Sequence, residues 1–131
     1  MTKKILIVDD EPDIVSYLEM VLQDQGYETS TAGNGNEALD AVKANRPDLV
    51  TLDITMPEAS GTRFYKEIRT DPEYSGIPVI IVTAVTGLGG DKFAYEKFIS
   101  NRKLVPAPEA YFPKPIDREA FIEAVKGLLE D

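Results

Sequence analysis

Three short apolar runs are the feature of this sequence that most limits its fold. Four apolar residues in succession stand at 5–8, Leu49, Val50 and Leu52 form a second run, and the most apolar run spans 78–82. Short, continuous runs of this kind are typical of strands buried on both faces of a sheet. Stretches with apolar residues at helical spacing separate them. This alternation predicts a doubly wound α/β domain with a parallel sheet and right-handed crossovers.

Weaker signals complete the expected order of elements. Alternating polarity predicts a further strand, at the edge of the sheet, and a short aromatic segment predicts the last one. The expected strands are 5–8, 27–32, 49–52, 78–82 and 110–112. The first expected helix begins at Pro12 and stops at Gly26, the second lies around 38–42 after a turn at 33–35, and the third lies around 64–68 after a loop at 57–61. The fourth lies around 93–99, between a flexible glycine-rich stretch at 87–90 and an extended linker at 105–108. The last helix begins after the capping residue Asp117.

Composition restricts the possible functions. The 131 residues, 43% hydrophobic and 28% charged, predict one globular domain spanning 1–131, either a protein by itself or part of a longer chain. A net charge of −9 disfavours direct binding of nucleic acid. The absence of Cys and His excludes thiolate chemistry and histidine ligands or phosphoacceptors within the chain. No apolar run approaches the ~20 residues of a membrane span, and no signal peptide is visible, so we expect a soluble cytoplasmic protein.

Polar residues stand at the carboxyl ends of four expected strands: Asp9 with Asp10, then Asp53, Thr83 and Lys114. In a parallel sheet these ends meet at one edge, where ligands bind. Clustered carboxylates repel one another, and Mg²⁺ relieves that repulsion while pairing with phosphate oxygens. A lysine neutralises further charge, and a threonine hydroxyl can hydrogen-bond a phosphoryl oxygen. The set suits in-line phosphoryl transfer to an aspartate carboxylate.

In this ordered combination the chain resembles the receiver domains of two-component response regulators over essentially its whole length. The matching residues are Asp9-Asp10, Asp53 with Met56-Pro57 and Gly61, Thr83-Ala84 and Lys114-Pro115. The resemblance implies a five-stranded flavodoxin-like sheet of order 2-1-3-4-5. It also implies that Asp53 accepts a phosphoryl group from the phosphohistidine of a sensor histidine kinase or phosphotransfer protein.

The resemblance further assigns roles around Asp53. Mg²⁺ would be bound by Asp10 directly, by Asp9 partly through water, by Asp53, and by the backbone carbonyl of Thr55, a position that in the family also tunes phosphoryl lifetime. Two further residues, Thr83 and Lys114, would contact the phosphoryl group.

The resemblance also implies a switch. Tyr111 would be the aromatic residue whose ring turns inward on phosphorylation, and the bond from Lys114 to Pro115 would be cis. The output face would lie on the helix before the last strand, that strand and the last helix, where a downstream protein binds.

The chain departs from the family between Thr83 and Lys114. Thirty residues separate the two, more than the resemblance predicts, and Val105–Glu109 replaces the usual Gly-Ala-Asp turn. Pro113 directly before the lysine is also unusual, because it removes an N–H group. We therefore expect an enlarged region between the fourth and fifth strands with its own partner surface, and a monomer or weak homodimer.

Each signal has a simpler explanation when taken alone. The run Asp9–Glu11 also suits a helix N-terminus, Thr83 can cap a helix, Lys114 can be a solvated loop cation, and Tyr111 can be half-buried packing. For the first three, the simple explanations require coincidences at successive strand ends.

Three other functions compete with the phosphorylation switch. A phosphohydrolase with an aspartate nucleophile usually carries a second acid two residues later, where this chain has Thr55. A flavin carrier needs a phosphate-binding loop after the first strand, where the acidic run would repel the cofactor. A degenerate receiver that acts only through protein contacts would not need the full set of site residues.

Overall fold

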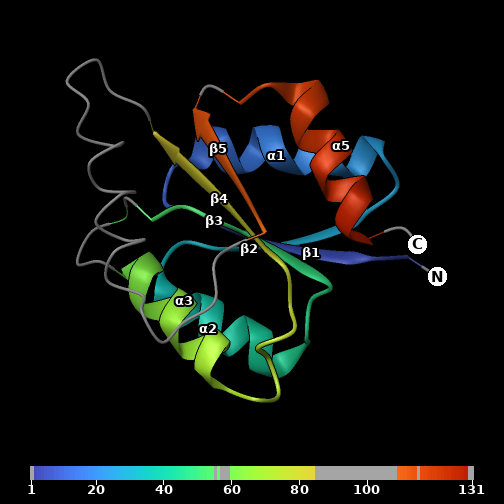
Figure 1. Cartoon of the computed structure of the whole chain (residues 1–131). Helices are drawn as coiled ribbons and strands as arrows, with labels where there is room; N and C mark the ends of the chain where they lie inside the picture. The colour runs from blue at the N-terminus through green and yellow to red at the C-terminus, as the bar shows by residue number, and fades with distance from the viewer. Residues whose placement is uncertain (1, 55, 57–59, 85–108, 115, 130–131) are drawn as a thin grey trace.

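A five-stranded parallel sheet runs through the middle of the structure (Figure 1). This computed structural model describes residues 2–54, 56, 60–84, 109–114 and 116–129. The strand order β2-β1-β3-β4-β5 confirms the predicted doubly wound, flavodoxin-like arrangement. The last strand is two residues longer than predicted, because Pro113 and Lys114 continue the pairing with β4. The strands are β1 (Lys4–Val8), β2 (Glu28–Ala32), β3 (Leu49–Leu52), β4 (Val79–Ala84) and β5 (Ala110–Lys114).

Helices cover both faces of the sheet. In Figure 1, α1 and α5 lie on one face and α2 and α3 on the other. The predictions for 87–90, 93–99 and 105–108 fall outside the described residues. Among the helices that the structure describes, none is long and apolar enough to cross a membrane. The helices are α1 (Pro12–Asp24), α2 (Gly35–Ala44), α3 (Ser60–Thr70) and α5 (Arg118–Leu129).

Two separate cores explain why the central strands are apolar at nearly every position. Leu6 and Val8 of β1 belong to the cluster that packs under α2 and α3. Ile5 and Ile7 belong to the cluster under α1 and α5. All four are at most 1% exposed, and each such side chain stabilises the fold by about 1.5–3 kcal/mol. The outer strand β2 differs: most of its residues are exposed, as predicted for an edge.

Local signals set the ends of α1 and α2. Pro12 occupies the first turn of α1, and Gly26 adopts φ +90° just after the helix, which glycine does without strain. The Asn34 side chain accepts a hydrogen bond from the Glu37 amide at 2.9 Å and so caps α2. Gly35 was predicted to be the last residue of a turn, but it is the first residue of α2.

The start of α3 also differs from the prediction. A loop was expected through Gly61, but the helix begins at Ser60 and includes that glycine in its first turn. A Cβ atom at Gly61 would lie 2.3 Å from the backbone oxygen of Asp53. Glycine is required here for the close approach of the helix to the end of β3, and not to break the helix.

Candidate functional site

Asp9 and Asp53 lie side by side at the carboxyl edge of the sheet. Val8 pairs with Leu52 in the β1–β3 register, and each acid is the next residue along its strand. The Asp53 amide donates to the Val8 carbonyl at 2.9 Å, and the Asp9 amide donates to the Ala32 carbonyl at 3.1 Å. These bonds continue the sheet pairing by one residue and hold both acids at its edge.

Four carboxylates gather at this point. One oxygen from each of Asp9, Asp10, Glu11 and Asp53 lies within 4.8 Å of the others. Asp9 is 3% exposed and Asp53 is 1% exposed, whereas the other two are exposed. The Glu11 amide donates to Asp9 Oδ1 at 2.9 Å, which folds the acidic run back toward the end of β1. The site thus has a buried half on the sheet and an exposed half on the loop.

The donor set fits a hard divalent cation. The oxygens of Asp9 and Asp53 lie within 4.8 Å of each other, so the two carboxylates repel one another when both are ionised. Carboxylate oxygens are the ligands that Mg²⁺ takes in proteins, together with several waters. A cation that needs only a few protein oxygens can therefore bind these residues and relieve the repulsion.

The other predicted site residues come from β4 and β5. Thr83 pairs with Pro113 and Ala84 pairs with Lys114, so the backbone of both predicted phosphoryl-contacting residues lies at this same edge. Their side chains, Thr55 and Pro115 lie outside what the structure describes. Tyr111 is half-buried and packs against the core cluster beneath α2 and α3.

Two cavities share the exposed acid Asp10 in their walls. Asp10 lines both a cavity of about 290 Å³ and one of about 270 Å³. Met56 and Arg63 are in the wall of the first, and Asp9 and Thr31 are in the wall of the second. The acidic cluster is therefore bordered at Asp10 by two hollows.

The roles of two residues of the site were not predicted from the sequence. Glu11 was recognised in the acidic run but not counted with the metal ligands, although its carboxylate belongs to the cluster. Its position directly after Asp10 was the available signal. Gly61 was assigned to a loop, and no local signal shows that its backbone packs on Asp53.

Comparison with known proteins finds similarity along the whole chain. The profile of the family described as response regulator receiver domain matches residues 5–126. The chain is 37% identical over 131 residues to the polar-differentiation response regulator DivK of Brucella anthropi, covering 100% of this chain and 99% of that one.

Solved structures give the same result. A CheY-like response regulator receiver domain protein from Methanospirillum hungatei has a TM-score of 0.81 at 27% identity, covering 99% of this chain and 95% of that one. The chemotaxis response regulator CheY4 of Vibrio cholerae has a TM-score of 0.77 at 26% identity, covering 98% and 100%. The similarity therefore extends over nearly the full length of each chain compared.

Proposed function

The chain belongs to the response regulator receiver domain family, and from this premise we propose that it is a phosphorylation switch with Asp53 as the phosphoacceptor. The donor is the phosphohistidine of a sensor histidine kinase or phosphotransfer protein. The observation that carries the proposal is the position of Asp53. Asp53 is 1% exposed and directly follows the central strand β3, and one of its carboxylate oxygens lies within 4.8 Å of an oxygen from each of three other carboxylates.

The proposed cofactor is Mg²⁺, held by Asp9, Asp10 and Asp53 with the backbone carbonyl of Thr55. The clustered carboxylate oxygens support this ligand set. When bound, the cation neutralises the negative charge of the phosphoryl oxygens during transfer. Burial of Asp9 and Asp53 fixes two ligands, while Asp10 is exposed to solvent.

The chemical step at Asp53 is an in-line displacement. A carboxylate oxygen of Asp53 attacks the phosphorus, the P–O bond forms as the donor's P–N bond breaks, and the histidine nitrogen takes back the electron pair. Thr83 donates a hydrogen bond to one phosphoryl oxygen and Lys114 neutralises another. Attack by water on the same phosphorus later releases inorganic phosphate and restores the carboxylate.

Tyr111 is the proposed link from the site to a downstream protein. Its ring is half-buried against the core in this structure, so it has further surface to bury when Thr83 moves toward the phosphoryl group. The change alters the face formed by β5, α5 and the segment before β5. Affinity for the downstream protein then depends on phosphorylation.

Labelling with acetyl phosphate and Mg²⁺, followed by intact-mass spectrometry, tests the assignment. Asp53→Asn should abolish the phosphoryl adduct, because the amide is a poor nucleophile and cannot form an acyl phosphate. Chelation of Mg²⁺ should abolish it in the unchanged protein.

Asp48→Asn is the matched control, since Asp48 lies just before the same strand and its Oδ2 accepts a hydrogen bond from the Lys4 amide at 2.8 Å. This variant should label normally. An adduct retained by Asp53→Asn would refute the site.

A further inference from the structure

A partly buried ion pair fastens the beginning of β5 to the end of α3. Arg69 Nη2 donates to Oε1 of Glu109, the residue directly before β5. The Arg69 side chain is 3% exposed and that of Glu109 is 33% exposed. The two residues are 40 positions apart in the sequence, so the pair exists only in the folded chain.

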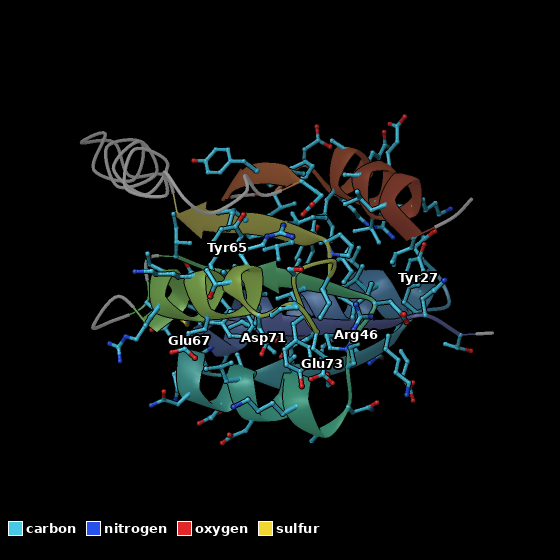
Figure 2. All side chains as sticks on the ribbon, turned by 60° about the horizontal axis from the view of Figure 1, so that its bottom comes forward. Tyr27, Arg46, Tyr65, Glu67, Asp71 and Glu73 are labelled. Atoms are coloured by element: carbon cyan, nitrogen blue, oxygen red, sulfur yellow. The ribbon has the colours of Figure 1, made fainter. Side chains whose placement is uncertain are left out.

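Arg69 is held by more than its partner. Its Nη1 donates to the carbonyl oxygens of Ser75 at 3.0 Å and Ile77 at 3.1 Å. Its guanidinium carbon lies 5.2 Å from the centre of the Tyr65 ring, a cation–π contact. Figure 2 shows Tyr65 on α3, the helix that carries both residues. The arginine therefore ties α3 to the segment that leads into β4.

Glu109 binds both backbone groups of the first residue of β4. Its Oε1 accepts from the Val79 amide at 2.7 Å, and its own amide donates to the Val79 carbonyl at 2.9 Å. These two bonds place Ala110 opposite Ile80, which is the first pair of the β4–β5 register. The Glu109 carboxylate thus forms the ion pair with Arg69 and also helps to fix the register of β5 on β4.

The strand β5 needs such an anchor. It follows β4 only after the 25 residues at 85–109, so no short turn sets its register. It lies at the edge of the sheet and contains Pro113, which lacks the N–H needed for pairing. A slip of one residue would exchange the faces of Tyr111 and Phe112, which pack on opposite cores, and would separate Lys114 from Ala84.

We propose that Arg69 and Glu109 are positioning residues for phosphoryl transfer: they hold β5 in the register that brings Lys114 to the edge of the sheet where Asp53 lies. This inference rests on the proposed function, because it takes Lys114 as a residue that contacts the phosphoryl group. The pair lies at the opposite end of β5 from the site, and it acts through the strand and not by contact with the reacting atoms.

The test separates cation binding from the transfer step. The proposed Mg²⁺ ligands directly follow β1 and β3, so Glu109→Ala should leave the Mg²⁺ dissociation constant, measured by calorimetry, unchanged. The rate constant for phosphorylation by acetyl phosphate at saturating Mg²⁺ should fall about 10- to 100-fold, since small misplacements of a catalytic group cost that much. Thermal melting verifies that the variant is folded during the assay.

Two further variants complete the design. Glu109→Gln keeps an oxygen that can accept from the Val79 amide but removes the charge that faces Arg69, and it serves if the alanine variant does not fold. Arg118→Ala is the matched control: its ion pair with Asp24 spans 3.9 Å between side chains 53% and 63% exposed, and its loss should leave both quantities unchanged.

A double-mutant cycle distinguishes positioning from general destabilisation. Lys114→Ala should slow phosphorylation, and adding Glu109→Ala to it should cause no further loss, because the group being positioned is already absent. A multiplicative loss, a parallel drop in Mg²⁺ affinity, or an unchanged rate in Glu109→Ala would overturn the inference. An unchanged rate in Lys114→Ala would instead refute the role of that lysine in the proposed function, and the inference with it.

Discussion

Gly61→Ala should damage both the stability of the domain and its candidate site. The added Cβ would lie 2.3 Å from the Asp53 backbone oxygen and 3.2 Å from Ile54 Cα. To lengthen the contact between this Cβ and the Asp53 oxygen from 2.3 Å to 3.0 Å, the first turn of α3 or the end of β3 must move by 0.7 Å. Both neighbours are backbone atoms, so no side chain can rotate away.

The magnitude follows from two opposing effects. Alanine in place of glycine inside a helix stabilises by about 1 kcal/mol. Overpacking against fixed atoms costs about 1–3 kcal/mol and can cost more, and the 2.3 Å contact favours the upper end. We expect a net loss of about 2 kcal/mol, which lowers the melting temperature of a domain of this size by about 5–8 °C. Phosphorylation of Asp53 should slow as well, because its backbone is displaced.

Gly127→Ala in α5 is the matched control. It is the same substitution in a helix, but apart from its two chain neighbours and the adjacent backbone of α5, no atom lies within 4 Å of the Cβ built there. It should stabilise by about 0.5–1 kcal/mol, opposite in sign to Gly61→Ala. Urea unfolding of the two variants and the unchanged protein measures both effects. If Gly61→Ala were as stable as Gly127→Ala, the close approach of α3 to Asp53 would be wrong.

Two further predictions concern helix capping and alkaline pH. Asn34→Ala removes the side-chain acceptor at the start of α2 and should lower the free energy of unfolding by about 1 kcal/mol in urea titrations, and no change would refute the cap. Burial raises the pKa of Tyr74 above its ordinary value of 10.0, and the charges of Glu73 and Asp71 raise it further. Arg46 has the opposite effect on this pKa, and Figure 2 shows the three charged residues. The folded state thus favours the neutral phenol, so the contribution of Tyr74 to the free energy of unfolding is fully present below pH 10 and is lost as pH rises through the raised pKa. Tyr74→Phe should make the free energy of unfolding fall less steeply over this pH range. An identical pH profile of stability in both proteins would contradict the prediction.

The local pattern of the sequence was sufficient for most of the fold. Strands β1, β3 and β4 could be predicted because helices cover both faces of the sheet, which requires apolar side chains at nearly every position. The cap of α5 was also predicted: the Ala120 amide donates to Asp117 Oδ1 at 3.1 Å. Asp9 and Asp53 could be brought together from the sequence alone, since the ends of parallel strands share one edge.

Other features depended on contacts between segments distant in the chain. The sequence by itself determined where in the chain the strands lie and which acids follow β1 and β3, because those properties depend on polarity and spacing over a few positions. Tertiary structure alone decided that Gly61 lies inside α3 against Asp53, that β5 continues through Lys114, and that Glu109 pairs with Arg69. Each of these depends on the distance between atoms far apart in the sequence, and no local pattern of residues encodes that distance.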